Sequence, residues 1–255
     1  MLPEQCQFIV LAGVNKCGTS SLAYALKKHP NIYLANGKEP AFFVEDRFFD
    51  SQGKVNEVDL SNYHFYVYKF FESVTHYLDA STIYSGFPKC MKRIMEYRSD
   101  AKIVIVFRNP INRAYSAWWH FASDGKSEKH SFHDAIINEA KYCMEAKDLG
   151  YSLRSYVSRG FYSNTIRMIW RYFDKSQVLP IKFESMVANK QETLNSIFNF
   201  IGVEQVELEF GHKLKSAYPC PMSDEDKEYL KYVYEYSIKD LERMLSWDCS
   251  DWLST

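Results

Sequence analysis

The sequence lacks the cysteine and histidine patterns of metal sites and of disulfide-rich domains. Its six cysteines are scattered over 255 residues without CxxC pairs or zinc-finger spacing, and no HExxH segment occurs. A chain of this length with 46% apolar residues can bury a core without disulfide bonds. We therefore expect reduced thiols and no metal site.

The chain also lacks an excess of positive over negative charge, or the reverse, and it lacks a long hydrophobic run. Lys and Arg number 31 against 32 Asp and Glu, which leaves a formal net charge of -1. No global basic field therefore favours nucleic acid or an anionic membrane as a partner. No stretch approaches the ~18 apolar residues of a membrane-spanning helix, and the N-terminus shows no signal-peptide pattern. These features predict a soluble cytoplasmic protein and leave its oligomeric state open.

No internal repeat, low-complexity tract or linker interrupts the sequence, which predicts one domain over residues 1–255. Short apolar runs alternate with segments of helical periodicity, a pattern typical of an α/β fold with a central parallel sheet flanked by helices. The expected strands are 8–11, 77–78, 102–107 and 178–183. The expected helices are 19–28, 62–71, 87–97, 110–121, 131–145, 153–157, 162–173, 190–201 and 223–245, and residues 31–61 are expected to be mostly loop.

The first expected strand runs into a turn bracketed by Gly13 and Gly18, with the spacing of a Walker A loop. Thr19 occupies the position of the lysine of a kinase or ATPase, and Lys16 lies inside the turn instead. Two glycines can also make such a turn for purely structural reasons. A strand, a glycine turn and a helix start nevertheless form the usual cradle for phosphate.

The strand expected at 102–107 ends in Arg108, followed by Asn109 and Pro110, which suit a helix start. Ser116 lies two turns into that helix. An arginine and a hydroxyl near the carboxyl end of a strand are suited to a second phosphate group. A P-loop kinase would instead need a strand-end aspartate for magnesium, and no expected strand ends that way.

The chain resembles sulfotransferases that use 3′-phosphoadenosine 5′-phosphosulfate (PAPS), in the branch of heparan sulfate and bacterial enzymes. The resemblance rests on the Lys16 turn and on Arg108 with Ser116 eight residues later. It also rests on five further segments: 38–43 (KEPAFF), 160–162 (GFY), 178–184, 198–202 (FNFIG) and 215–219 (KSAYP). It implies a three-layer, P-loop NTPase-like fold.

The resemblance also implies roles for individual residues. Glu39 would be the catalytic base, and Lys16 would stabilise charge on the leaving phosphate. Arg108 and Ser116 would bind the 3′-phosphate of the donor and of its product, 3′-phosphoadenosine 5′-phosphate (PAP). The 5′-phosphosulfate would be held by Cys17, Gly18, Thr19, Ser20 and Ser21, and the loop 204–222, with Lys213, Lys215 and Ser216, would close over the nucleotide.

Several of these residues have a plainer interpretation. Glu39 would ordinarily be an exposed loop acid, and Lys38 is as well explained as a surface lysine as by a role in binding sulfate. His120 is an alternative base, although a packed helix histidine is the more common case. Arg113 is expected to be a solvated helix arginine. Most aromatic residues are expected in the core, but Phe42, Phe43 and Tyr84 are candidates for the floor of an acceptor pocket.

The expected acceptor is a small molecule or sugar with a hydroxyl or amine. The glycan branch often carries basic residues where this chain has Ala80 and Ala217, so a polyanionic glycan would lose those contacts. This favours natural-product biosynthesis. Two other functions remain open: a P-loop nucleotide kinase-like phosphotransferase and a non-catalytic nucleotide-binding protein.

Overall fold

The computed structural model describes residues 5–36, 38–49, 73–123, 128–139, 155–211 and 218–254. The chain forms two compact units, each built from two stretches of sequence. Unit 1 comprises Met1–Val106 and Met168–Leu214, and unit 2 comprises Phe107–Arg167 and Lys215–Thr255. The expectation of one domain over residues 1–255 stays a prediction.

Unit 1 is built on a sheet of five strands in the order β2-β3-β1-β4-β5. The pairs β2–β3, β3–β1 and β1–β4 are parallel. This confirms the predicted α/β class with a central parallel sheet. The strands are β1 (Gln7–Gly13), β2 (Ile32–Leu34), β3 (His76–Asp79), β4 (Lys102–Phe107) and β5 (Val178–Lys182). The sequence reading missed β2, which lies in the stretch expected to be loop.

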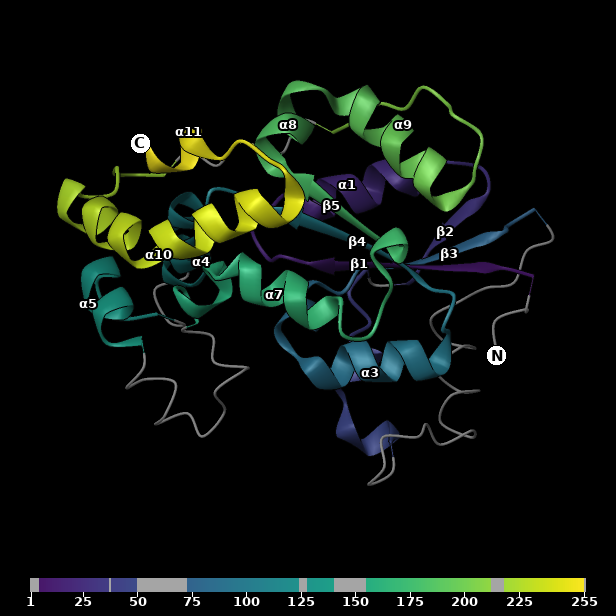
Figure 1. Cartoon of the computed structure of the whole chain (residues 1–255), viewed down its shortest axis with the longest axis horizontal. Helices are drawn as coiled ribbons and strands as arrows, with labels where there is room; N and C mark the ends of the chain where they lie inside the picture. The colour runs from purple at the N-terminus through teal and green to yellow at the C-terminus, as the bar shows by residue number, and fades with distance from the viewer. Residues whose placement is uncertain are drawn as a thin grey trace. The chain divides into compact units, whose positions relative to one another are not determined.

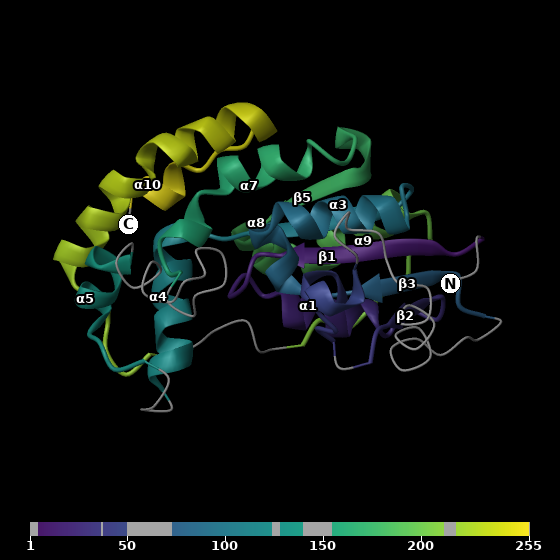
Figure 2. The same cartoon turned by 90° about the horizontal axis from the view of Figure 1, so that it is seen from below.

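Helices cover both faces of this sheet. In Figures 1 and 2, α3 (Pro88–Tyr97) lies on one face, and α1 (Thr19–Leu26), α8 (Phe183–Ala188) and α9 (Lys190–Ile201) lie on the other. The side chains of residues 8–12 in β1 and 103–107 in β4 are at most 1% exposed. Unbroken apolar runs are what strands covered on both faces require. Unit 1 also holds the short 3₁₀ helices η1 (Phe42–Val44), η2 (Asp46–Phe48), η3 (Thr82–Gly86) and η5 (Lys175–Gln177).

Unit 2 is helical in its described residues, and its two main helices begin at side-chain caps. The Asn109 side chain accepts hydrogen bonds from the backbone N–H groups of Ile111 (3.0 Å) and Asn112 (3.3 Å), as its position before Pro110 predicts. Ser223 caps the other helix. The elements are α4 (Pro110–Ala122), α5 (Phe132–Ile137), η4 (Ser158–Gly160), α7 (Tyr162–Ile169), α10 (Asp224–Leu245) and α11 (Ser250–Leu253).

The expectation that Arg113 is solvated is wrong, because its side chain is fully buried in unit 2. The guanidinium donates to the backbone carbonyl of Tyr156. Glu139, also buried, accepts from the backbone N–H groups of Val157 and Ser158. Burial raises the pKa of Glu139, and these hydrogen bonds and the charge of Arg113 oppose that rise. The arginine therefore offsets a buried carboxylate that holds the turn before η4.

Four expected helices differ from the structure or leave its described range. The helix expected at 162–173 ends at Ile169, as α7. Residues 62–71 lie outside the described residues. Residues 155–157 of the helix expected at 153–157 are not helical, because their backbone is held by Arg113 and Glu139. In the helix expected at 131–145, α5 ends at Ile137, and residues 140–145 lie outside the described ranges.

A buried histidine in β3 makes the stability of unit 1 depend on pH. His76 is 8% exposed, with Nε2 3.0 Å from the carbonyl of Ile201 in α9. Burial lowers its pKa, so the folded protein resists protonation that the unfolded chain accepts near pH 6.5. Stability contributed by neutral His76 is therefore present above about pH 6.5 and lost as the pH falls below it.

We expect the free energy of unfolding, measured with urea between pH 8 and pH 5, to fall less steeply in His76→Gln than in the wild-type chain. Glutamine can donate to the Ile201 carbonyl but does not titrate. Parallel curves for the two proteins would contradict this account.

Candidate active site

The turn after β1 has an unusual backbone in unit 1. Gly13, Lys16 and Gly18 have φ angles of 152°, 67° and 75°, all in the region that favours glycine. A left-handed lysine costs conformational energy, and such residues gather at functional sites. The Val14 N–H donates to the carbonyl of Val106 in β4 (3.0 Å), so the turn is fixed to the neighbouring strand.

The turn leads directly into α1. Gly18 is the N-cap residue and has no side chain to accept from the N–H groups of the first helical turn. Such N–H groups and the positive end of the helix dipole attract an anion. Of the nearby hydroxyl residues, Thr19 is buried, Ser21 is half-buried and Ser20 is exposed. The backbone at this turn thus has the shape that a phosphate cradle requires, and phosphate binding by these residues stays a prediction.

Gly13 allows the turn η3 to pack directly on the end of β1. A Cβ atom placed on Gly13 would lie 2.3 Å from Ser85 Oγ and 3.0 Å from the carbonyl oxygen of Thr82. Only glycine permits this approach. Residues 13–18 form the turn that we call the phosphate-type turn. Its first residue, Gly13, therefore contacts the segment that follows β3.

The segment after β3 also contacts Glu39, through the side chain of Thr82. The Thr82 hydroxyl donates to Glu39 Oε2 (3.1 Å), and Lys38 Nζ forms an ion pair with Glu39 Oε1. The Glu39 side chain is 41% exposed, so its carboxylate is accessible, whereas the Lys38 side chain is only 10% exposed. Lys38 is therefore not an ordinary surface lysine.

A buried carboxylate fixes the backbone that follows Glu39. Asp79, the last residue of β3, is fully buried and accepts from Ser81 Oγ (2.6 Å) and Tyr84 Oη (2.9 Å). Ser81 Oγ in turn accepts from the backbone N–H of Ala41 (3.0 Å), a residue with a left-handed φ of 54°. These bonds tie the residues after Glu39 to the end of β3.

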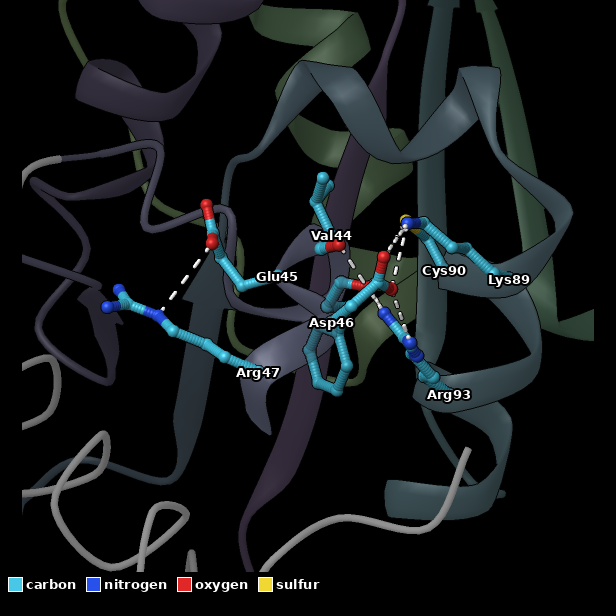
Figure 3. A network of polar contacts seen from close by, with 8 residues as sticks. Val44, Glu45, Asp46, Arg47, Lys89, Cys90 and Arg93 are labelled. Carbon is cyan, nitrogen blue, oxygen red and sulfur yellow. Dashed lines mark hydrogen bonds and ion pairs between the residues drawn. The ribbon is translucent and has the colours of Figure 1, made fainter. Parts of the chain in front are cut away.

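Helix α3 holds the far end of the segment that follows Glu39, at residues 43–46, as Figure 3 shows. Arg93 donates to the carbonyl of Phe43 (2.9 Å) and to Asp46 (2.8 Å), which also accepts from Lys89 (2.9 Å). Hydrogen bonds from Lys89 and Arg93 lower the pKa of Asp46. Cys90 lies beside the same carbonyl, and burial raises the pKa of its thiol to about 12.

Two sequence expectations for this region need correction. Phe42, Phe43 and Tyr84 are at most 1% exposed, so they belong to the core of unit 1 and do not form the floor of an open pocket. The expectation that no strand ends in an aspartate is also wrong, because β3 lies beside β1 and ends in Asp79. Both carboxylate oxygens of Asp79 accept hydroxyl hydrogen bonds.

The residues expected at the second phosphate lie in unit 2 or beyond the described ranges. Arg108 directly follows β4 and is half-buried, whereas Ser116 in α4 is 4% exposed. His120, also in α4, is exposed. The expected nucleotide-loop residues Lys213, Lys215 and Ser216 lie outside the described residues.

Two features are absent from the described part of the chain. There, no group of three or more His, Cys, Asp and Glu side chains is placed to hold a metal ion. Within the same ranges, no helix combines the length and the apolar character needed to cross a bilayer.

Sequence reasoning identified Lys16, Gly18 and Glu39, which the structure places in unit 1, but it missed Asp79, Ser81 and Thr82. The available signal was a carboxylate and two hydroxyls at the carboxyl end of a strand. Open α/β sheets bind ligands beside the carboxyl ends of their strands.

The parallel sheet and the glycine-bracketed turn after β1 define a P-loop-like α/β fold. A sequence model of the sulfotransferase domain matches residues 7–224. The chain therefore belongs to the sulfotransferase family, whose members are transferases with PAPS as their usual donor.

Among its relatives is human carbohydrate sulfotransferase 15, 25% identical over 249 residues that cover 76% of this chain and 43% of the relative. Another is the bifunctional heparan sulfate N-deacetylase/N-sulfotransferase 1 of Caenorhabditis briggsae, 32% identical over 214 residues that cover 79% of this chain and 23% of that protein. The chain thus spans less than half the length of these relatives.

Among solved structures, the sulfotransferase of Alicyclobacillus acidocaldarius matches with a TM-score of 0.80 and 25% identity, covering 98% of this chain and 99% of the other. A mouse sulfotransferase solved with PAP matches with a TM-score of 0.59 and 13% identity, covering 96% and 89%. The latter shows the shared fold alone.

Because η3 packs on Gly13, we expect Gly13→Ala to lower the free energy of unfolding by about 1–3 kcal/mol in urea titrations. The new methyl group would meet Ser85 Oγ and a backbone carbonyl. Gly86→Ala, in the same turn, is the matched control, because a Cβ there meets no atom within 4 Å. Equal stability changes in the two variants would disprove the proposed close approach.

Proposed function

We propose that the protein transfers a sulfuryl group from PAPS to a hydroxyl or amine of a small molecule or sugar. The observation that carries the proposal is the contact of Thr82 with both the first glycine of the phosphate-type turn and the carboxylate of Glu39. This contact lies within unit 1 and joins an anion-binding turn to an accessible base.

Glu39 acts as the general base in this proposal. It accepts the proton of the acceptor as the acceptor oxygen or nitrogen attacks sulfur, in line with the bond to the 5′-phosphate oxygen. That bond breaks and its electrons leave with PAP. Lys38 and Thr82 hold one oxygen each of the Glu39 carboxylate and so fix its direction.

The turn supplies the charge that the leaving group needs. The backbone N–H groups of residues 17–20 and the hydroxyls of Thr19, Ser20 and Ser21 bind the phosphosulfate, and Lys16 stabilises the negative charge that grows on the 5′-phosphate. Arg108 and Ser116 bind the 3′-phosphate, and Lys213, Lys215 and Ser216 bind the nucleotide from the loop that closes over it. No metal ion is needed, since Lys16 and the N–H groups supply the positive charge.

The acceptor class rests on two considerations. The relatives named for carbohydrate and heparan sulfate sulfation support a sugar acceptor. A polyanionic glycan fits less well, because the chain has a net charge of -1 and the position expected to carry a basic residue holds Ala80, which is fully buried. A smaller sugar or natural product is the acceptor we propose.

A cytoplasmic location is part of the same proposal. The cysteines in the described ranges form no disulfide bonds with one another, in keeping with a reducing compartment.

To test the base, we expect Glu39→Gln to lower kcat for sulfate transfer by about 10²- to 10⁴-fold, the usual worth of a positioned general base. The amide has the same shape but cannot take the proton, so the Kd for PAP should not change. The measurement is mass-spectrometric detection of sulfated product from PAPS and a panel of hydroxyl and amine metabolites.

Glu45→Gln is the matched control, because Glu45 is exposed in the same segment and pairs with Arg47 at 3.8 Å. It should keep wild-type kcat. Normal turnover in Glu39→Gln together with loss in His120→Ala would move the role of base to His120.

A further inference from the structure

Thr82 lies where the phosphate-type turn and the base meet. It is the first residue of η3 and is 7% exposed. Its side chain and its backbone have different partners, since Oγ1 donates to Glu39 and the carbonyl oxygen faces Gly13. One residue therefore contacts both parts of the proposed site.

The backbone carbonyl of Thr82 has a hydrogen-bond partner and lies close to Gly13. The Thr82 carbonyl accepts from Ser85 Oγ at 3.1 Å, and a Cβ on Gly13 would lie only 3.0 Å from the same oxygen. The missing Cβ of Gly13 is what allows η3 to lie this close to the end of β1. Asp79 fixes the preceding residue by accepting from Ser81 Oγ. Thr82 is thus held by groups on both sides of it in the chain.

The side chain of Thr82 directs its hydroxyl group at one oxygen of Glu39. Thr82 is β-branched, so few χ1 rotamers are open to it, and its hydroxyl hydrogen points at one oxygen of a carboxylate. A hydrogen bond from a hydroxyl to a charged oxygen is among the stronger kinds. The other oxygen is held by Lys38, whose long side chain has more freedom than that of threonine. Thr82 is therefore the more rigid of the two constraints on Glu39.

We propose that Thr82 is a positioning residue for Glu39, setting the direction of the carboxylate relative to the turn after β1. This inference rests on the proposed role of Glu39 as base. Without the hydroxyl, Glu39 keeps its charge and its pairing with Lys38 but loses its fixed orientation. Turnover should then suffer more than the binding of either substrate.

The test compares Thr82→Val with Thr82→Ser in the sulfate-transfer assay. Valine has nearly the shape of threonine but no hydroxyl, and serine restores the hydroxyl without the methyl group. We expect kcat to fall about tenfold or more in Thr82→Val and to return to within about threefold in Thr82→Ser. The KM for PAPS and the Kd for PAP should stay within about twofold of wild type.

A double variant separates positioning from a general structural effect. If Thr82 acts through Glu39, adding Thr82→Val to Glu39→Gln should change the residual kcat by less than about twofold. Thr193→Val in α9 controls for the substitution itself, because that hydroxyl donates to the carbonyl of Asn189, the N-cap residue of the same helix. It should leave kcat unchanged.

The outcomes distinguish this inference from the proposed function. Wild-type kcat in Thr82→Val, or the same tenfold loss in both backgrounds, would overturn the role of Thr82 while leaving Glu39 as base. Full activity in Glu39→Gln would overturn both the role of Glu39 as base and the positioning role of Thr82. No sulfate transfer by the wild-type chain would overturn the proposed function itself.

Discussion

The close packing of η3 on Gly13 is the contact on which the rest of the proposed site depends. Because Gly13 has no side chain, the carbonyl of Thr82 and the hydroxyl of Ser85 reach the end of β1. That approach places the Thr82 hydroxyl within 3.1 Å of Glu39. A larger residue at position 13 would push η3 away and alter the relation between the turn after β1 and Glu39, the proposed base.

A second constraint is the buried carboxylate of Asp79. It lies at the end of a strand beside β1, where a P-loop kinase would hold a magnesium ligand. Here the Asp79 oxygens accept from the hydroxyls of Ser81 and Tyr84, and Ser81 holds the backbone N–H of Ala41. The carboxylate therefore acts as a structural anchor for the segment that carries Glu39. This use of a strand-end acid fits sulfuryl transfer without a metal better than magnesium-dependent phosphoryl transfer.

The sequence was sufficient to predict features set by local chemistry. The apolar run of β4, the Asn109 cap and the glycine turn are all encoded by neighbouring residues. Features set by distant contacts could not be predicted. Arg113 has sequence neighbours typical of a solvated helix residue, and only the fold reveals its hydrogen bond to the Tyr156 carbonyl and its charge interaction with Glu139. Likewise, 43 positions separate Glu39 from Thr82, so no spacing rule connects them. The three-residue strand β2 is too short to give a periodic signal.

The most direct test of the central claim is calorimetric titration of the wild-type chain with PAP, with adenosine 5′-monophosphate and with ATP plus magnesium. A turn that binds a phosphosulfate nucleotide, with Arg108 on the 3′-phosphate, should bind PAP at least about tenfold more tightly than either of the others. Tighter binding of ATP with magnesium, and no gain from the 3′-phosphate, would contradict the account and favour a phosphotransferase.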